Sequence, residues 1–364
     1  MITLADAAKN TLPDIDLMVI DEFRKSSAIL DALTFDQAVN PAGGGATLTY
    51  GYTRHVHERP AHFRAYNTEY RKAEATRKRY EVDLFPLGGA FDIDRILADL
   101  GPAATNEVSY QISQLIKATR AKFSNEFING VYVETADELE PRGFDGIDKA
   151  VSGTVTERTA STRWGDLSDA DQAHDALDEL DEWLDTLDAL PTMLLGNDKG
   201  IARLRSLARR AGYYERTRNE FGFEVESYRG IPLVNPRERD GSAEPIIGTD
   251  ETGWTSLYAV RFGLDGVHGV TTTGGELVRT WLPDFTTAGA VKTGEVEMGP
   301  VAVVVKRTRS AGALRINVAP YEPNRRPQRV TIAGAEGSVP VEVTGQPVEV
   351  VDHTPPTPKT TRKQ

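Results

Sequence analysis

LFPLGGAFDIDRILADLGPAATNEVSYQISQLIKATRAKFSNEFING, residues 84–130, carries two regular patterns in succession. In the first, Phe91 and Ile93 alternate with aspartates, and this period of two predicts a half-buried strand. Gly88 and Gly89 come just before it and predict the bend by which the chain enters the strand. The stretch contains no catalytic signature, so it indicates a structural scaffold.

The second pattern predicts one long amphipathic helix. Pro102 suits the first turn of such a helix, and Gly130 is typical of a left-handed C-terminal cap. Apolar side chains recur every three or four residues, which gives about seven turns with one apolar stripe. The stripe consists of Val108, Ile112, Leu115, Ile116, Thr119, Phe123 and Phe127.

The composition is that of a soluble globular chain. It has 364 residues, of which 39% are hydrophobic and 26% charged, enough for a large core. Cysteine is absent, which excludes disulfides and thiolate metal sites. The N-terminus lacks a signal peptide and no run of about 18 apolar residues occurs, so we expect no membrane partner and an intracellular site of synthesis.

The formal net charge of -12 argues against a protein that grips nucleic acid, because phosphate binding depends on lysine and arginine. The charge is unevenly spread. Residues 52–80 hold eight basic and three acidic residues, whereas residues 166–190 hold ten acidic residues and no basic one. The acidic segment also has a helical apolar stripe, which predicts an amphipathic helix with an acidic outer side: Ala173, Leu177, Leu180, Trp183, Leu184, Leu187 and Leu190.

A second amphipathic helix is predicted from Asp198 to Ala211, and its outer side is basic. It includes Arg209 and Arg210 at its C-terminal end. We expect the basic and acidic helices to neutralise each other, either within one chain or between neighbouring chains.

Two groups of residues resemble parts of metal sites. His55, His57 and Glu58 are close in sequence, but strand alternation explains their spacing and no third ligand is nearby. Asp92 and Asp94 resemble the DxD pair of aspartates that holds a metal-bound phosphate, but they also form the polar face of the predicted strand. We therefore expect no catalytic residue, no metal and no cofactor. A metal-dependent enzyme is the alternative of another class, and it predicts that alanine at His57 or Asp92 abolishes an activity.

Five blocks in a fixed order resemble the major capsid proteins of tailed bacteriophages, which have the Hong Kong 97-like fold. They are residues 86–101 (PLGGAFDIDRILADLG), 111–130 (QISQLIKATRAKFSNEFING), 144–150 (FDGIDKA), 228–234 (YRGIPLV) and 255–274 (TSLYAVRFGLDGVHGVTTTG). The resemblance covers residues 47–318.

The resemblance implies an α+β chain with an inserted domain. The expected parts are an N-terminal arm (1–46), an extended loop hairpin (47–83), a peripheral domain with a long spine helix (84–165), an inserted axial domain (166–280), return strands of the peripheral domain (281–320) and a C-terminal extension with a disordered tail (321–364). Residues 301–306 and 313–318 are expected to complete the peripheral domain as strands.

The resemblance also implies function. Copies of the chain are expected to assemble as hexamers and pentamers into an icosahedral phage head, formed in the host cytoplasm, that encloses double-stranded DNA without sequence-specific binding. Scaffolding, portal and decoration proteins are the further partners. In this fold the extended loop crosses a neighbouring subunit, which gives the expected intersubunit contacts: Arg54, Arg59, Arg64, Tyr66, Tyr70, Arg71, Lys72, Arg77, Lys78, Arg79, Arg209 and Arg210.

Two related possibilities remain. An encapsulin-like nanocompartment shares the fold but encloses cargo enzymes. Some family members also join their subunits by lysine–asparagine isopeptide bonds. Here the lysines are Lys72 and Lys78 and the asparagines Asn317 and Asn324, but nothing local marks them as reactive, so we expect non-covalent assembly.

Overall fold

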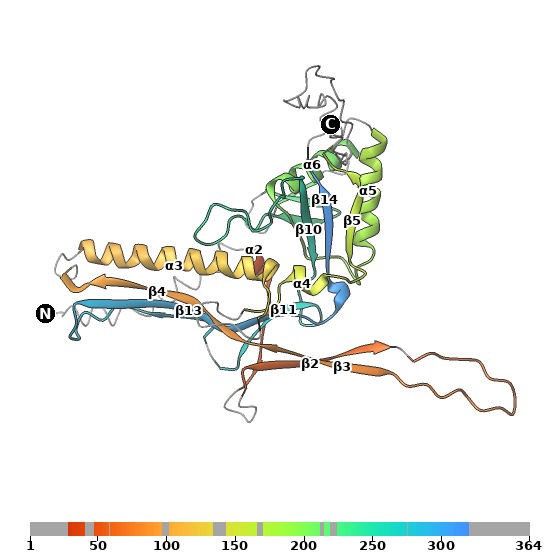
Figure 1. Ribbon diagram of the computed structural model, residues 1–364, viewed down its shortest axis with the longest axis horizontal. Coiled ribbons are helices and arrows are strands. Elements are labelled where there is room, and N and C mark those ends of the chain that lie inside the picture. The colour runs from red at the N-terminus through yellow and green to blue at the C-terminus, as the bar shows by residue number, and fades with distance from the viewer. Residues whose placement is uncertain are drawn as a thin grey trace, which may run out of the picture. The chain divides into compact units, whose positions relative to one another are not determined.

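The computed structural model describes residues 28–40, 47–57, 59–96, 102–133, 143–165, 170–211, 215–218, 224–274 and 276–319 (Figure 1). Residues 1–27 and 41–46 of the expected N-terminal arm and the whole expected C-terminal extension, 321–364, lie outside them. The elements are α2 (Ala28–Ala32), β1 (Phe35–Val39), β2 (Thr49–His57), β3 (Thr76–Asp83), β4 (Phe85–Asp94), α3 (Pro102–Asn129), α4 (Ile147–Val151), β5 (Glu157–Arg163), α5 (Ala170–Leu184), β6 (Met193–Leu195), α6 (Asp198–Ala211), β7 (Glu215–Arg218), β8 (Glu224–Tyr228), β9 (Ile231–Val234), β10 (Trp254–Val260), β11 (Val267–Thr272), β12 (Val278–Trp281), β13 (Val291–Val305) and β14 (Ala311–Asn317).

A five-stranded sheet is built around the 15-residue strand β13, which pairs with β11, β12 and β4. Strand β1 joins its edge by parallel pairing with β11. Helix α3 packs on one face of this sheet, and Figure 1 shows it running alongside β4 and β13. The predicted strand at 91–94 and the return strand at 301–306 therefore lie in one sheet, as expected.

The long helix is confirmed with the predicted bounds. Its stripe is buried against the sheet at Ile112, Ile116, Phe123 and Phe127. Gly130 does end it, but the prediction of a left-handed cap is wrong because Gly130 has no positive φ. The reason for glycine is space: a Cβ there would lie 2.4 Å from the carbonyl oxygens of Glu126 and Phe144.

The predicted bend at Gly88 and Gly89 is also wrong, because both residues lie inside β4 and pair with β13. A Cβ on Gly88 would lie 2.1 Å from the carbonyl oxygen of Val296, and one on Gly89 would lie 2.7 Å from the Leu115 side chain. Glycine is needed here because β13 and α3 approach β4 closely.

We expect Gly88→Ala to lower the free energy of unfolding by about 1–3 kcal/mol, because the added methyl group forces β4 and β13 apart. Gly248→Ala is the matched control, since a Cβ at Gly248 meets no atom within 4 Å. Urea unfolding of the unassembled chain measures both, and equal stability of the two variants would contradict the packing argument.

A seven-stranded sheet has the order β5-β14-β10-β6-β9-β8-β7. Helices α5 and α6 pack together over it, and their apolar stripes share one core with β10 and β14. Both helices are confirmed, and α6 has the predicted bounds. Helix α5 ends at Leu184, so Leu187 and Leu190 of the predicted stripe lie beyond it: Leu187 still packs against this core, whereas Leu190 is exposed.

Residues 313–318 were expected as a strand of the peripheral domain, and most of them do form a strand, β14, but it is not paired with β4 or β13. Strand β14 pairs along its whole length with β10 and also pairs with β5, in the seven-stranded sheet. Its burial is nearly continuous, as in a strand with neighbours on both sides and covered faces. Strands β11 and β12 lie in the five-stranded sheet, although β11 and all of β12 except Trp281 fall inside the expected axial range of 166–280.

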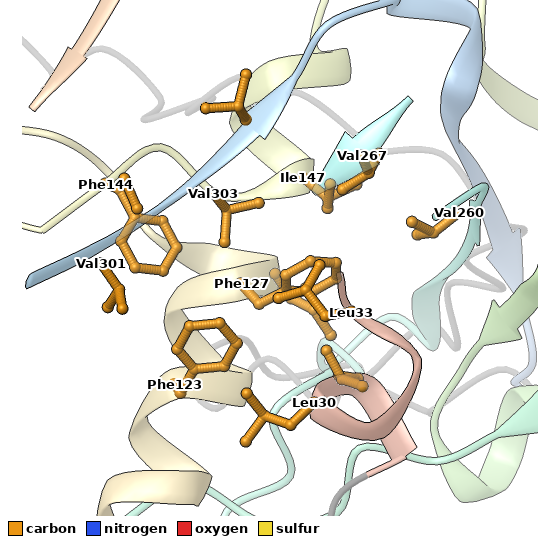
Figure 2. Close-up of a cluster of buried hydrophobic side chains, with 14 of the residues drawn as sticks. Leu30, Leu33, Phe123, Phe127, Phe144, Ile147, Val260, Val267, Val301 and Val303 are labelled. Carbon is orange, nitrogen blue, oxygen red and sulfur yellow. The ribbon is translucent and has the colours of Figure 1, made fainter. Parts of the chain in front are cut away.

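The core beneath α3 includes residues that were expected in the N-terminal arm. Ile29, Leu30 and Leu33 are buried there, and Figure 2 shows Leu30 and Leu33 beside Phe123 and Phe127. Part of the segment that was expected as the N-terminal arm therefore contributes buried side chains to this chain's own core. Among the described helices, none has the length and hydropathy needed to cross a membrane.

Candidate assembly surfaces

The predicted extended hairpin is present as β2 and β3, an antiparallel pair in which Tyr52 faces Tyr80 and His55 faces Arg77. Its root is tied to the end of β13. The Arg54 side chain donates to the carbonyl oxygens of Val305 and Lys306, the latter at 2.9 Å from Nε, and the Tyr52 hydroxyl donates to that of Val305 at 3.3 Å. Arg54 therefore contacts its own chain.

An aromatic cluster reinforces the root. The Tyr52 ring stacks on Tyr80 at 5.5 Å and lies 6.3 Å from Tyr50, and the Arg54 guanidinium lies 4.6 Å from the centre of the Tyr80 ring. Burial raises the pKa of Tyr52, so its hydroxyl remains a neutral donor. Cation–π contacts and hydrogen bonds together fix the direction in which the hairpin leaves the sheet.

His268 on β11 lies buried beneath this cluster, with its ring edge-on to Tyr50 at 6.1 Å. Burial, and then the positive charge of Lys306, lower the pKa of His268. The unfolded chain consequently takes up this proton more readily than the folded chain. The contribution of His268 to the free energy of unfolding is therefore complete above its pKa in the unfolded chain, about 6.5, and is lost as the pH falls below that value.

We therefore expect the free energy of unfolding of the unassembled chain to decrease between pH 7 and pH 5, and His268→Phe to reduce this decrease. His174→Asn is the control, because His174 is exposed on α5. Urea titrations at several pH values measure the slope. A slope that His268→Phe leaves unchanged would refute the assignment.

The loop at the tip, residues 59–75, has little packing of its own. Arg59 Nε donates to the carbonyl oxygen of Ala73 at 2.9 Å, and the Arg64 guanidinium lies 5.2 Å from the Tyr70 ring centre. Phe63 and Tyr66 are 94% or more exposed. Exposed aromatic side chains on an extended loop make residues 59–75 a candidate assembly surface.

Most of the predicted contact residues do lie on the outside of this hairpin. Exposed side chains are found at Arg59, Arg64, Tyr66, Tyr70, Arg71, Lys72, Arg77, Lys78 and Arg79. Lys78 contacts the Tyr80 ring and Arg79 pairs with Glu81 at 2.8 Å. Sequence reasoning overlooked Phe63, since an isolated aromatic in a charged loop has no periodic signal.

Charged side chains of α5 and α6 form a second exposed surface. Asp181 of α5 accepts hydrogen bonds from Tyr228 and Arg229, and Arg205 of α6 pairs with Glu226 at 2.7 Å. These partners belong to β8 and the turn after it. Arg209 and Arg210 are exposed at the end of α6.

The described residues that resembled parts of metal sites are exposed on a strand or hydrogen-bonded to nearby protein groups. His55 is exposed on β2, and Glu58 and the His57 side chain lie outside the described residues. Asp92 accepts a hydrogen bond from Thr293 at 2.7 Å and Asp94 accepts one from the Ile96 amide. In the described part of the chain, no three His, Asp or Glu side chains gather in a way that could hold a metal ion.

Of the two asparagines considered for isopeptide bonds, Asn317 lies in the described part of the chain. Asn317 is buried in β14, and its amide donates to the carbonyl oxygen of Thr252. Asn324 lies outside the described residues.

Comparisons with known proteins give structural matches along most of the chain. No family model and no curated protein matches the sequence. An encapsulin complex from Synechococcus elongatus matches with a TM-score of 0.55 and 17% identity over 82% of this chain and 90% of the other. The capsid of a native GTA particle matches with a TM-score of 0.51 and 13% identity over 80% of this chain and 90% of the other. Mycobacterium phage Adephagia matches with a TM-score of 0.50 and 14% identity over 81% of this chain and 91% of the other.

The chain has the Hong Kong 97-like capsid fold. The predicted α+β fold class is confirmed. The hairpin of β2 and β3 lies in the residue range expected for the extended loop, and α3 lies in the range expected for the spine helix. At 13–17% identity this likeness establishes the fold alone.

Proposed function

We propose that this chain is the structural shell protein of a tailed-phage head, which assembles as hexamers and pentamers into an icosahedral shell around double-stranded DNA. The observation that carries the proposal is the hairpin. It is fixed at its root by Arg54 and Tyr52, yet its tip exposes Phe63, Tyr66 and several cations that its own chain leaves uncovered. A partner subunit is the occupant that the capsid fold suggests.

Assembly explains this arrangement in physical terms. A contact between two different surfaces of identical chains is repeated around a ring, so modest contacts add up in a closed shell. Charged residues at such contacts set the register and the rate of association. The net charge of -12 suits a wall that encloses DNA without holding it tightly.

The proposal assigns each of the two large sheets to a different domain of the shell protein. The five-stranded sheet with α3 is proposed as the peripheral domain, and the seven-stranded sheet with α5 and α6 as the axial domain at capsomer centres. Scaffolding, portal and decoration proteins are the further proposed partners, the virion is the proposed location, and non-covalent contacts hold the shell. The role is structural rather than catalytic.

An encapsulin-like shell is the second candidate, because an encapsulin is among the structural matches. The contents of purified particles distinguish the two. DNA of genome length supports the phage head, whereas enclosed enzymes support the nanocompartment. Mass photometry of the purified chain tests both at once: particles of many copies are expected, and a chain that stays monomeric at all concentrations and salt conditions would overturn them.

The α6 surface gives a separate prediction. We expect Arg209→Glu with Arg210→Glu to reduce particle yield at least tenfold, because these exposed cations are proposed to face the acidic side of a neighbouring α5. Thermal unfolding of the unassembled chain should stay within a few degrees of the original. Lys149→Glu, an exposed change on α4, is the control that still assembles. Equal loss of assembly and folding would refute an intersubunit role.

A further inference from the structure

The seven-stranded sheet has one face that is only partly covered. Alternate residues of β10 and β14, such as Leu257 and Leu314, share a buried core with α5 and α6. On the opposite face, Tyr258 is covered by α4 and donates a hydrogen bond to Asp148 of that helix at 2.8 Å. Nearer the start of β10 the same face is open, and Trp254 there is 36% exposed.

A cavity of about 590 Å³ lies at this open part of the sheet. Strands β5, β14 and β10, which Figure 1 shows side by side, line it together with the loop of residues 248–250. A cavity of this volume has room for a small organic molecule. The chemistry of its lining residues therefore indicates which class of molecule fits.

Arg315, the cation that lines the cavity, is neutralised by carboxylates of its own chain. Its Nη2 atom lies 3.0 Å from a carboxylate oxygen of Glu157 and 2.5 Å from one of Asp148, and its Nη1 atom donates to the Ser256 hydroxyl at 2.7 Å. An anionic ligand would have to compete with these carboxylates and would also meet Asp250 in the cavity. The cavity therefore disfavours anions.

Asp250 supplies a hydrogen-bond acceptor. Its Oδ1 atom accepts hydrogen bonds from the Thr252 amide, the Thr252 hydroxyl and the Trp254 amide, at 2.7 to 2.9 Å. These hydrogen bonds, that from Trp254 above all, lower the pKa of Asp250, so its carboxylate is ionised at neutral pH. Its Oδ2 atom accepts none of these bonds, so it can accept one from a hydroxyl group of a ligand.

Two hydroxyl side chains of the cavity can also bond to a ligand. Thr249 Oγ1 accepts a hydrogen bond from the Asn197 amide at 2.8 Å and keeps its own proton to donate. Thr159 is exposed on β5, and its hydroxyl forms no hydrogen bond with the described residues. The cavity thus offers neutral donors beside one charged acceptor.

Trp254 adds a flat apolar surface to these polar groups. A ligand that is apolar throughout would leave Asp250 and Thr249 without partners, which costs free energy. A molecule that carries hydroxyl groups around a ring of C–H groups satisfies both kinds of surface. Sugars have this chemistry.

We propose that this cavity binds a neutral sugar of one or two units. The sugar ring stacks on Trp254, and its hydroxyl groups bond to Asp250, Thr249 and Thr159. The inference goes beyond the proposed function and does not depend on it, because it needs only the seven-stranded sheet of a single chain.

Saturation-transfer NMR of the purified full chain tests this. The probes are the methyl glycosides of glucose, galactose, mannose and N-acetylglucosamine. We expect a signal from at least one of them, and we expect Trp254→Ala to reduce that signal at least tenfold because the stacking surface is lost. Trp281→Ala is the matched control, since Trp281 is exposed on β12, and it should keep the signal.

Two milder variants test the hydrogen bonds and guard against a Trp254 variant that does not fold. Thr159→Val removes a hydroxyl but keeps the volume and the strand preference. Asp250→Asn keeps the Oδ1 acceptor of the turn and removes the charge. We expect each to raise the dissociation constant about three- to tenfold, as the loss of one hydrogen bond does, with the unfolding temperature almost unchanged.

The outcomes decide between the ligand classes. No signal from any of the four glycosides, or a signal that Trp254→Ala leaves unchanged in folded protein, would overturn the inference. Choline is the comparison probe, because a tryptophan beside a carboxylate also suits a quaternary ammonium ion. Binding of choline without binding of any glycoside would show a cation site and would refute the sugar.

Discussion

We expect replacement of residues 60–74 by a Gly-Ser linker to abolish particle formation and to leave the chain folded. The loop is exposed, and its hydrogen bonds are local, such as that from Arg59 to Ala73. The free energy of folding therefore changes little when the loop is replaced, because closing the linker between β2 and β3 costs only loop-closure entropy. Assembly loses every contact that the tip makes with a neighbour.

Mass photometry for assembly and circular dichroism for folding make the comparison. The control keeps the rings and removes only hydroxyls, with Tyr66→Phe and Tyr70→Phe, and should still assemble. Closed particles formed by the loop-replaced chain would show that the tip is not an assembly surface.

Phe123→Ala is expected to lower the free energy of unfolding by about 3–5 kcal/mol, a large part of the stability of an ordinary domain. Phe123 is fully buried on α3, with its ring 5.9 Å from Phe144 and 6.4 Å from Phe35. Figure 2 shows it in the cluster that also holds Leu30 and Phe127. Alanine leaves a cavity that these elements cannot close.

Tyr110→Ala on the same helix is the control, because Tyr110 is 57% exposed and should change stability by only about 0.5 kcal/mol. Urea unfolding of the unassembled chain gives both values. Equal effects at Phe123 and Tyr110 would contradict the burial of this face of α3.

Local patterns predicted the local elements well. The period of the apolar residues from Val108 to Phe127 is a property of the helix itself, so α3 and α6 could be bounded from the sequence. The hairpin was expected from the resemblance, because the basic composition of residues 52–80 by itself left their structure open. Its direction was not, since this depends on Arg54 binding the carbonyl oxygens at the end of β13.

Long-range pairing was not predictable. Strand β14 (AGALRIN) is mainly apolar, like the second half of β13, and nothing within it shows that its partners are β5 and β10 rather than β4. Residues 35–39 form too short a pattern to be assigned to a core, and their place depends on parallel pairing with β11. Residues such as Asp92 and Glu295, which β4 and β13 bring to neighbouring positions of one sheet, could not be grouped from the sequence because they lie some 200 positions apart in the chain.

Electron microscopy of the purified chain, expressed alone and together with its neighbouring genes, tests the central claim most directly. The account predicts closed shells or capsomer rings, with the hairpin of each subunit lying across the next. A strictly monomeric species under both conditions would contradict it and would return attention to an enzymatic role.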